Sequence, residues 1–361
     1  MSKIVIVSSS KENKVGGVER FCNLLKEVLK NDFEVEVIGK EDIKNFLFYK
    51  IFSKVKGLDT IVISYFLGKC ADKLKPDLVI TNGPFGFSTK IKSLNVQHGT
   101  FAGASDKIDK NLIKKFIRKY LWGFFERKAA QKAKKVIAVS NWTKNAVVKY
   151  YKIDQSKIEV ILNAIDINVF KKLDKFESRK KLNLPLYKKL ILFVGRLSYE
   201  KSPEIIFELA KKFEKEDIYF VLVTNKNPFW NLKNIFIFQN IPNNQLPLFY
   251  SACDIFILPS KYEGCPFTLI EAMACKIPFV VTNVGCVPEI LNQFPELGFF
   301  VVNELSPESF YYKIKEIFAM DTKELEILIE KGYNFILNNC SIDSFGKKYL
   351  EIIKNILKQN D

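Results

Sequence analysis

Short runs of β-branched and other apolar residues recur along the chain, and amphipathic stretches with helical spacing lie between many of them. The ten runs predicted as strands are Ile4–Val7, Val35–Ile38, Leu78–Ile80, Val136–Val139, Ile158–Leu162, Leu190–Val194, Tyr219–Val223, Ile235–Phe238, Ile255–Leu258 and Phe279–Val281. Strands that alternate with helices are typical of parallel α/β sheets. Both halves of the chain open with a buried strand that leads through a loop into a helix, at Lys3–Ser10 and at Lys189–Arg196. The pattern predicts two doubly wound, Rossmann-like domains.

A polar segment separates the two halves, and Pro185 precedes the first strand of the second half. We predict an N-terminal domain over residues 1–168, a linker over 169–186 and a C-terminal domain over 187–341. Residues 342–361 form a last helix, which we expect to pack back on the N-terminal domain because its apolar residues fall on one stripe. The stripe consists of Phe345, Tyr349, Ile352, Ile353, Ile356 and Leu357.

The composition favours a protein of the reducing cytosol. The chain has 361 residues, 48% of them apolar, which is ample for two buried cores. Its seven cysteines are scattered and contain no C-x-x-C pair, so neither a disulfide framework nor a zinc site is indicated. No apolar run approaches the ~18 residues of a membrane span, and the first ten residues are too few for a secretory signal. We expect a cytoplasmic protein, soluble or peripheral on the cytoplasmic face of a membrane.

Charge is divided unevenly along the chain. Residues 1–166 hold 31 Lys and Arg against 17 Asp and Glu, whereas the rest holds 25 against 23. This asymmetry predicts that the first half faces an anionic surface or ligand.

Residues 107–135 carry 11 Lys and Arg against two acids, around apolar residues at helical spacing. They read either as a basic amphipathic helix on an anionic bilayer or as a core helix with its apolar stripe inward. We favour the core for the stripe, although its lysines could still meet a membrane. The stripe comprises Leu112, Ile113, Phe116, Ile117, Tyr120, Leu121, Phe124 and Phe125. Asp42–Lys56 is a second candidate for membrane contact.

In open α/β sheets, ligands bind beyond the carboxyl ends of the strands. After the strand Leu190–Val194 come Arg196, Lys201 and Pro203, which marks the start of a helix. Two fixed cations beside a helix N-terminus suit a diphosphate leaving group, whose growing charge they would stabilise. The plainer interpretation is a solvated Arg and Lys, but the near-neutral second half favours a functional pair.

Two glutamates follow the strand Ile255–Leu258. Glu263 lies in the loop after that strand, and Glu271 lies about one turn inside a helix predicted to begin around Phe267. Carboxylates accept hydroxyl hydrogen bonds such as a sugar or ribose diol offers. The plainer interpretation is a loop charge and a partner of the helix dipole, yet Glu271 sits in an apolar stretch and a buried glutamate needs partners.

The first half offers two further loops. Gly16 and Gly17 open a helix after the first strand, where paired glycines either let an anion approach or serve a turn with positive φ. His98, the only histidine, follows a strand-like segment and precedes Gly99 at the expected mouth of the sheet. A lone histidine is more often structural, but this position favours function.

Together these motifs resemble the GT-B retaining glycosyltransferases of family 4, over nearly the whole chain. The resemblance lies in G-G-x-E-R at 16–20, Q-H-G at 97–99, V-I-A-V-S-N at 136–141, N-A-I-D at 163–166, G-R-L at 195–197 with Lys201, and E-x7-E from Glu263 to Glu271. Each motif alone is common, but six in the same order are specific.

The resemblance implies a GT-B fold of two domains facing across a cleft, the first binding the acceptor and the second a nucleotide-sugar donor. Arg196 and Lys201 would hold the diphosphate, Glu271 the ribose and Glu263 the transferred sugar. The remaining implied donor-site residues are Gly16 and Gly17 near the phosphate, Gly264, the backbone N–H groups near Phe267, Thr268 and Leu269, and His98 beside the sugar. The implied catalytic set is His98, Arg196, Lys201 and Glu263.

The implied reaction is transfer, with retention, from a nucleotide-diphosphate sugar to a glycan or lipid-linked acceptor. Such transfer serves the assembly of cell-envelope polysaccharide, lipopolysaccharide or glycoprotein glycan. No metal or cofactor is expected, since the chain has no D-x-D and a single histidine. Two alternatives are a nucleotide-sugar epimerase on the same fold and a basic nucleic-acid-binding protein. The second lacks any recognition motif, so we expect no nucleic-acid partner.

Overall fold

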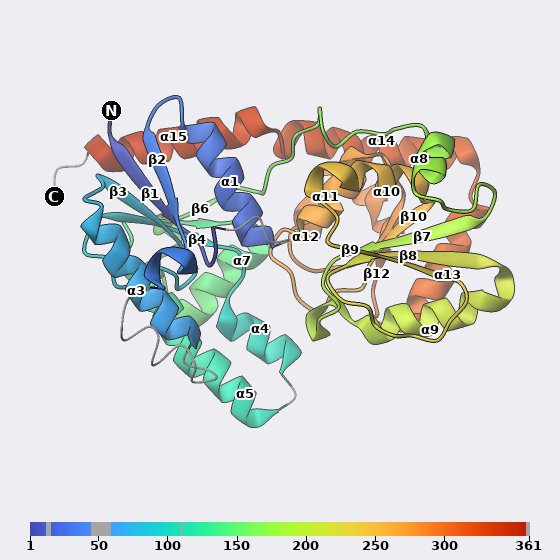
Figure 1. The fold of residues 1–361 in the computed structure, drawn as a ribbon, viewed down its shortest axis with the longest axis horizontal. Coiled ribbons are helices and arrows are strands. Elements are labelled where there is room, and N and C mark those ends of the chain that lie inside the picture. Colours follow the sequence, from blue (N-terminus) through green and yellow to red (C-terminus); the bar gives the residue numbers. More distant parts are fainter. Residues whose placement is uncertain (12–15, 45–58, 110, 359–361) are drawn as a thin grey trace. The chain divides into compact units, whose positions relative to one another are not determined.

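The computed structural model describes residues 1–11, 16–44, 59–109 and 111–358, which form two compact units (Figure 1). The first unit combines residues 1–163 with the C-terminal residues from 342, and the second comprises residues 164–341. Each unit is built on one six-stranded parallel sheet with helices packed on it. The α/β class and the two Rossmann-like domains predicted from the sequence are therefore confirmed.

The first sheet has the order β2-β1-β3-β4-β5-β6. Its strands are β1 Lys3–Val7, β2 Glu34–Ile38, β3 Leu78–Asn82, β4 Ser93–Gln97, β5 Lys135–Ala138 and β6 Ile158–Val160. All five pairings are parallel, with Ile4 of β1 beside Val35 of β2 and Leu78 of β3. The carboxyl ends of all six strands therefore lie at one edge of this sheet.

Helices cover the first sheet on both faces, as the connections between parallel strands require. They are α1 Gly17–Leu29, α3 Asp59–Lys73, α4 Phe101–Ile108, α5 Leu112–Phe116, α6 Gly123–Lys132, α7 Asn141–Ala146 and α15 Ile342–Lys358. Two π-helical turns, Ile117–Trp122 and Val147–Tyr151, continue α5 and α7. Helix α15 packs beside α1, where Phe345 and Tyr349 contact the ring of Phe21 (Figure 1). The predicted return of the C-terminal helix to the N-terminal domain is confirmed.

The second sheet has the order β12-β11-β10-β7-β8-β9. Its strands are β7 Lys189–Val194, β8 Ile218–Thr224, β9 Ile235–Gln239, β10 Ile255–Leu258, β11 Phe279–Thr282 and β12 Val301–Val302. The helices of this unit are α8 Lys175–Lys181, α9 Pro203–Phe213, α10 Leu246–Ala252, α11 Phe267–Ala274, α12 Val287–Gln293, α13 Pro307–Ala319 and α14 Thr322–Asn339. All ten predicted strands are present. Strand β4 corresponds to the strand-like segment before His98, and the two-residue β12 is additional.

The apolar stripe of residues 112–125 does not face the core as we expected. Five of its side chains are largely exposed: Leu112 at 81%, Ile113 at 71%, Phe116 at 64%, Tyr120 at 60% and Phe124 at 55%. The core cluster beside this region instead includes Ala102, Ala130, Val136 and Tyr151, and none of the five exposed side chains belongs to it. A helical stripe shows which residues share a face but not whether that face is covered, and here the core is closed without it. The second membrane candidate, Asp42–Lys56, lies mostly outside the described residues.

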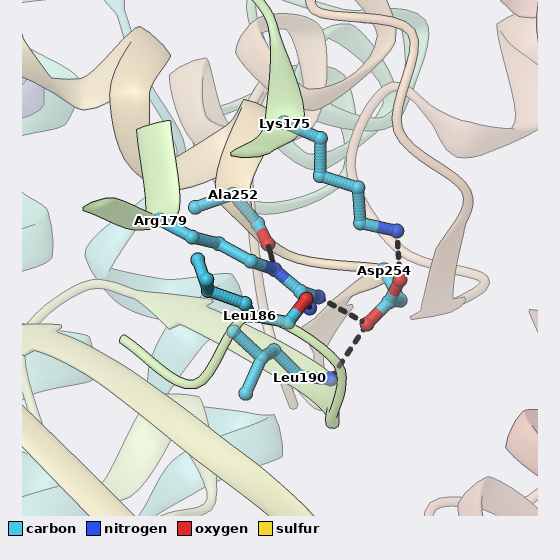
Figure 2. Close-up of polar contacts among 6 residues, drawn as sticks. All are labelled: Lys175, Arg179, Leu186, Leu190, Ala252 and Asp254. Atoms are coloured by element: carbon cyan, nitrogen blue, oxygen red, sulfur yellow. Dashed lines mark hydrogen bonds and ion pairs between the residues drawn. The ribbon is translucent and has the colours of Figure 1, made fainter. Parts of the chain in front are cut away.

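The residues predicted as a linker, 169–186, belong to the second unit and contain α8. Arg179 of α8 is only 3% exposed, and its guanidinium spreads over three partners (Figure 2). It donates to the carbonyls of Ala252 at 2.8 Å and Leu186 at 2.5 Å and pairs with Asp254 at 2.9 Å. Asp254 also accepts the backbone N–H of Leu190 at 2.7 Å. One buried cation therefore joins α8 to the starts of β7 and β10, at the sheet edge opposite the carboxyl ends.

Replacing Arg179 with alanine should destabilise the second unit by about 3 kcal/mol, because it leaves Asp254 and two carbonyls without their buried donor. Lys175→Ala is the matched control. Lys175 also pairs with Asp254, but its side chain is 44% exposed, so its loss should cost less than about 1 kcal/mol. Urea unfolding followed by circular dichroism measures both. Equal losses in the two variants would contradict this account of the cluster.

Candidate active site

The loops that follow β7 and β10 lie at the carboxyl edge of the second sheet, because β7 and β10 are parallel neighbours. The first loop carries Arg196 and Lys201, and the second carries Glu263. The backbone N–H of Lys261 donates to the carbonyl of Glu200 at 2.8 Å, and the Nζ of Lys261 donates to the carbonyl of Tyr199 at 3.0 Å. These bonds hold the two loops together as one surface.

Lys201 and Glu263 form a salt bridge across this surface, with side chains only 16% and 12% exposed. The hydroxyl of Ser260 also donates to Oε1 of Glu263 at 2.6 Å. Ser260 is itself fixed, since its carbonyl accepts the hydroxyl proton of Thr282 on β11 at 2.6 Å. Arg196, in contrast, is 64% exposed and forms a long ion pair with Glu200, at 3.7 Å. The structure thus holds one cation in place and leaves the other free to move.

Gly285 fixes the position of the Glu263 loop from behind. Its φ is +66°, and a Cβ placed on it would lie 2.6 Å from the carbonyl oxygen of Gly264 and 2.9 Å from the Cβ of Glu263. Only glycine combines this conformation with such a close backbone approach. The strand–glycine–helix segment after β11, a weak signal in the sequence, therefore supports the Glu263 loop.

Glu271 lies on α11 and is fully buried. Its Oε2 accepts the hydroxyl proton of Tyr250 on α10 at 2.7 Å, so the buried carboxyl has a polar partner. The predicted helix around Phe267 is confirmed, as α11 runs from Phe267 to Ala274. Tyr250 was not identified from the sequence, because nothing in its spacing distinguishes it from other core aromatics.

Four hydroxyl groups at the same edge of the sheet are buried and have no hydrogen-bond partner among the residues that the structure describes. They belong to Ser198, Ser202, Thr224 and Thr268. Thr268 lies in the first turn of α11, which starts after Pro266 without a side-chain cap. Phe267, Leu269 and Gly264 beside it are buried. Buried hydroxyls without partners are costly in a folded protein, so their clustering at this edge is typical of a ligand site.

In the first unit, the loop after β4 holds His98. Its Nε2 lies 2.9 Å from the side-chain oxygen of Asn82, and its ring meets the ring of Phe21 edge-on at 4.7 Å. The amide nitrogen of Asn82 donates to the carbonyl of Val7, so its oxygen is the acceptor and Nε2 of His98 carries the hydrogen. Burial lowers the pKa of His98 to about 4. His98 is therefore a neutral imidazole at pH 7, with Nδ1 left as an acceptor.

Gly16 precedes α1 with φ of −128°, so it does not serve a turn with positive φ. A Cβ there would lie 2.0 Å from Oε2 of Glu19, whose other oxygen accepts a hydrogen bond from Ser9. A side chain at this position would therefore require the Glu19 carboxylate to move away from its bond with Ser9. Gly17 is the exposed first residue of α1.

The two halves of the chain match two families. Residues 15–169 match Glycosyltransferase Family 4, and residues 174–335 match Glycosyl transferases group 1. Across 98% of both chains, the protein is 26% identical to a UDP-Gal:alpha-D-GlcNAc-diphosphoundecaprenol alpha-1,3-galactosyltransferase of Escherichia coli. It is also 32% identical over 177 residues to a putative teichuronic acid biosynthesis glycosyltransferase of Bacillus subtilis. That match covers 47% of this chain and 44% of the Bacillus subtilis chain.

Solved structures share the fold over the whole chain. Sucrose-phosphate synthase from Thermosynechococcus elongatus superposes with a TM-score of 0.80 at 17% identity, covering 99% of each chain. An Anabaena protein solved in complex with UDP-glucose gives 0.74 at 16% identity, covering 98% of this chain and all of that one. With both units matched in sequence and in fold, the chain belongs to the GT-B glycosyltransferases of family 4.

Proposed function

We propose that this glycosyltransferase takes a sugar from a nucleoside diphosphate sugar and passes it, with retention of the anomeric configuration, to a glycan or lipid-linked acceptor. The observation that carries the proposal is the Lys201–Glu263 pair, held at the carboxyl edge of the second sheet beside unpartnered buried hydroxyls. The Escherichia coli relative, by its name, uses a UDP-sugar and a diphosphoundecaprenol-linked acceptor. A role in cell-envelope glycan assembly follows from that likeness.

The charges of the site suit the departure of a diphosphate. Lys201 presents a fixed ammonium, and Arg196 is exposed enough to swing onto the phosphates. Both cations would stabilise the charge that grows on the leaving oxygen, with about 1.5–3 kcal/mol for each charge-assisted hydrogen bond. Because the protein supplies this charge itself, we propose that transfer needs no metal ion. Glu263 and Glu271 are then hydroxyl acceptors for the sugar and the ribose.

His98 remains a predicted member of the catalytic set. As a neutral imidazole it can offer only its Nδ1 lone pair, so it would accept a hydrogen bond from a sugar hydroxyl rather than donate charge. The N-terminus of α1 at Gly16 and Gly17 remains a predicted phosphate contact.

We also propose that the first unit binds an anionic membrane surface through the exposed stripe defined by Leu112, Ile113, Phe116, Tyr120 and Phe124. Four of these side chains, at 112, 116, 120 and 124, follow one another at intervals of four, so the stripe stays on one helical face. Lysines flank it, although Lys115 and Lys119 are partly neutralised by Asp106. Among the described residues, no helix is both long and apolar enough to cross a bilayer. Such a stripe suits a helix that lies in the interface.

Lys201→Ala and Glu263→Ala should each abolish transfer while leaving the fold intact. The reason is that one variant removes the fixed cation and the other removes the sugar contact. Lys188→Ala is the control, because it removes an exposed lysine from the amino end of β7 and should keep transfer. A thermal-shift screen of UDP-, GDP- and ADP-sugars first identifies the donor, since binding raises the melting temperature by mass action.

Turnover with that donor is then assayed against glycan and lipid-linked acceptors, with and without EDTA. The anomeric configuration of the product is read by NMR. Wild-type turnover in either site variant would refute the assignment, and release of an isomeric nucleotide sugar would identify an epimerase.

Gly285→Ala should lower transfer by about tenfold or more, because its Cβ would push the Glu263 loop out of place. Gly298→Ala is the matched control in the same unit. Its nearest neighbour would be a leucine methyl at 4.0 Å, and its φ is not in the left-handed region. Initial rates at saturating donor measure both variants. Equal rates for the two would show that the loop tolerates displacement.

Sedimentation with liposomes tests membrane binding. At physiological salt, the protein should pellet with vesicles that contain phosphatidylglycerol and stay in solution with phosphatidylcholine alone. The triple variant I113S/F116S/F124S should lose most of this binding, whereas Phe229→Ser, which alters an even more exposed aromatic in the second unit, should not. Protein that stays in the supernatant with and without acidic lipid would rule the surface out.

A further inference from the structure

Glu126 on α6 is a buried carboxyl group that the proposed reaction does not use. It is 4% exposed, and it lies beneath the loop that joins β4 to α4 and carries His98. Its Oε2 accepts the backbone N–H of Phe101 at 2.7 Å and the hydroxyl proton of Tyr151. Its Oε1 lies 3.0 Å from the side-chain amide of Gln97. The two oxygens therefore reach the residues on either side of the His98–Gly99–Thr100 segment.

The orientation of the Gln97 amide decides whether Glu126 carries a proton. One end of this amide lies 2.6 Å from Oδ1 of Asn95, and the other faces Oε1 of Glu126. Asn95 uses its own nitrogen to donate to the carbonyl of Gly83 at 2.9 Å, so its Oδ1 is an acceptor. The Gln97 nitrogen therefore belongs at the Asn95 end, which turns the Gln97 oxygen toward Glu126.

A charged carboxylate oxygen 3.0 Å from an amide oxygen repels it unless a hydrogen lies between them. The amide oxygen of Gln97 carries none, so the hydrogen belongs to Oε1 of Glu126. In this arrangement one pair of oxygens still lies close together without a hydrogen between them. It consists of the uncharged amide oxygen of Gln97 and the carbonyl oxygen of Gly99, 3.1 Å apart. The opposite orientation of Gln97 would let its nitrogen donate to Oε1 of Glu126 at 3.0 Å and to the carbonyl of Gly99 at 3.1 Å. It would also set two amide oxygens 2.6 Å apart at Asn95, which is the shorter and more repulsive contact.

We propose that Glu126 is a positioning residue for His98 that works as a neutral acid. Its Oε1–H donates to Gln97 and its Oε2 accepts from Phe101, so one carboxyl group holds both ends of the His98 loop. Loss of the proton would leave two oxygens opposed at Gln97, and the loop would have to shift to separate them. The proposal rests on the proposed part of His98 in transfer for its catalytic consequence, but not for the proton network itself.

The surroundings of Glu126 favour the neutral form. Burial raises its pKa to about 7, against the hydrogen bonds of Tyr151 and Phe101, which lower it. Tyr151 is the titratable group that bonds to it, and Gln97 from β4 and Gly83 after β3 are its uncharged neighbours. A Cβ on Gly83 would lie 3.1 Å from Oε1, so the backbone closes over that oxygen. His98, with a pKa near 4, stays neutral throughout the range in which Glu126 titrates.

The single histidine makes the network directly observable. In the full-length protein with imidazole ¹⁵N labels and no histidine tag, NMR should show His98 neutral and protonated on Nε2 from pH 5.5 to 8.5. Its signals should shift with a midpoint near pH 7 as Glu126 titrates. In Glu126→Gln, which keeps a donor and an acceptor at the same positions, this midpoint should disappear. In Tyr151→Phe it should rise, because a bond that lowers the Glu126 pKa is lost. An unchanged midpoint in Glu126→Gln, or none in the wild type, would overturn the proposal.

Stability offers a second readout that needs no substrate. The folded protein keeps the Glu126 proton between the ordinary pKa of 4.5 and the raised value near 7, whereas the unfolded chain has released it. Stability should therefore fall as the pH rises through this window and level off above it. The melting temperature of Glu126→Gln, relative to wild type, should rise from pH 5 to pH 7.5. A difference in melting temperature between the two proteins that stays constant from pH 5 to pH 7.5 would contradict the proposal that Glu126 is protonated.

Transfer kinetics complete the test. Glu126→Gln should keep wild-type kcat at pH 6 and lose the decline that the wild type shows as the pH rises through 7. Glu126→Ala should lower kcat by about tenfold or more with little change in KM for the donor. Wild-type kcat in Glu126→Ala would overturn the positioning role. Because the NMR and melting experiments use neither donor nor acceptor, their failure is distinct from a failure of the Lys201 and Glu263 variants, which test the proposed function.

Discussion

Every strand pairing in both sheets is parallel, and this constraint places all of the candidate chemistry. Parallel strands bring their carboxyl ends to one edge, so loops far apart in sequence emerge side by side. Lys201 and Glu263 are separated by sixty-two positions, yet they meet because β7 and β10 are neighbours. The same constraint puts the His98 loop beside Asn82 at the end of β3. The opposite edge of the second sheet carries the Arg179 cluster, which joins α8 to the starts of β7 and β10.

Three buried ionisable groups show how differently a low-dielectric interior can be used. Arg179 is charged and surrounded by a carboxylate and two carbonyls, so its cost of burial is met by full pairing. One oxygen of Glu126 accepts hydrogen bonds, and the other faces the Gln97 oxygen, which is an acceptor. We propose that this second oxygen is protonated, because the proton removes the repulsion between the two oxygens. Glu271 lies beyond the first turn of α11, and Tyr250 donates a hydrogen bond to one of its oxygens. The structural role of Arg179 and the proposed roles of Glu126 and Glu271 thus differ with the partners of each group.

Sequence reasoning recovered the strands and the helix that begins at Phe267, because those features are local in the chain. It also singled out Lys201, Glu263 and Glu271, since their residue types and spacing repeat a family pattern, and their roles in donor binding stay predictions. It did not find Tyr250, Ser260 or Glu126. These act through contacts between elements distant in sequence, and their residue types are ordinary in core or loop positions. The stripe at 112–124 failed for a related reason, because periodicity defines a face and only packing decides whether that face is covered.

The Lys201–Glu263 pair is better understood as preorganisation than as stabilisation. Both side chains are mostly withdrawn from water, so each must be paired to avoid a desolvated charge. A nucleoside diphosphate sugar would offer a phosphate to Lys201 and hydroxyls to Glu263, replacing both partners in one event. The free energy needed to separate Lys201 from Glu263 would then be offset only by a ligand that carries both a phosphate and sugar hydroxyls at the right spacing. A free nucleotide lacks the hydroxyls and a free sugar lacks the phosphate, so each would leave one buried charge unpaired. On the proposed function, the pair would select for the intact donor, while Ser260 and Gly285 would keep Glu263 in place.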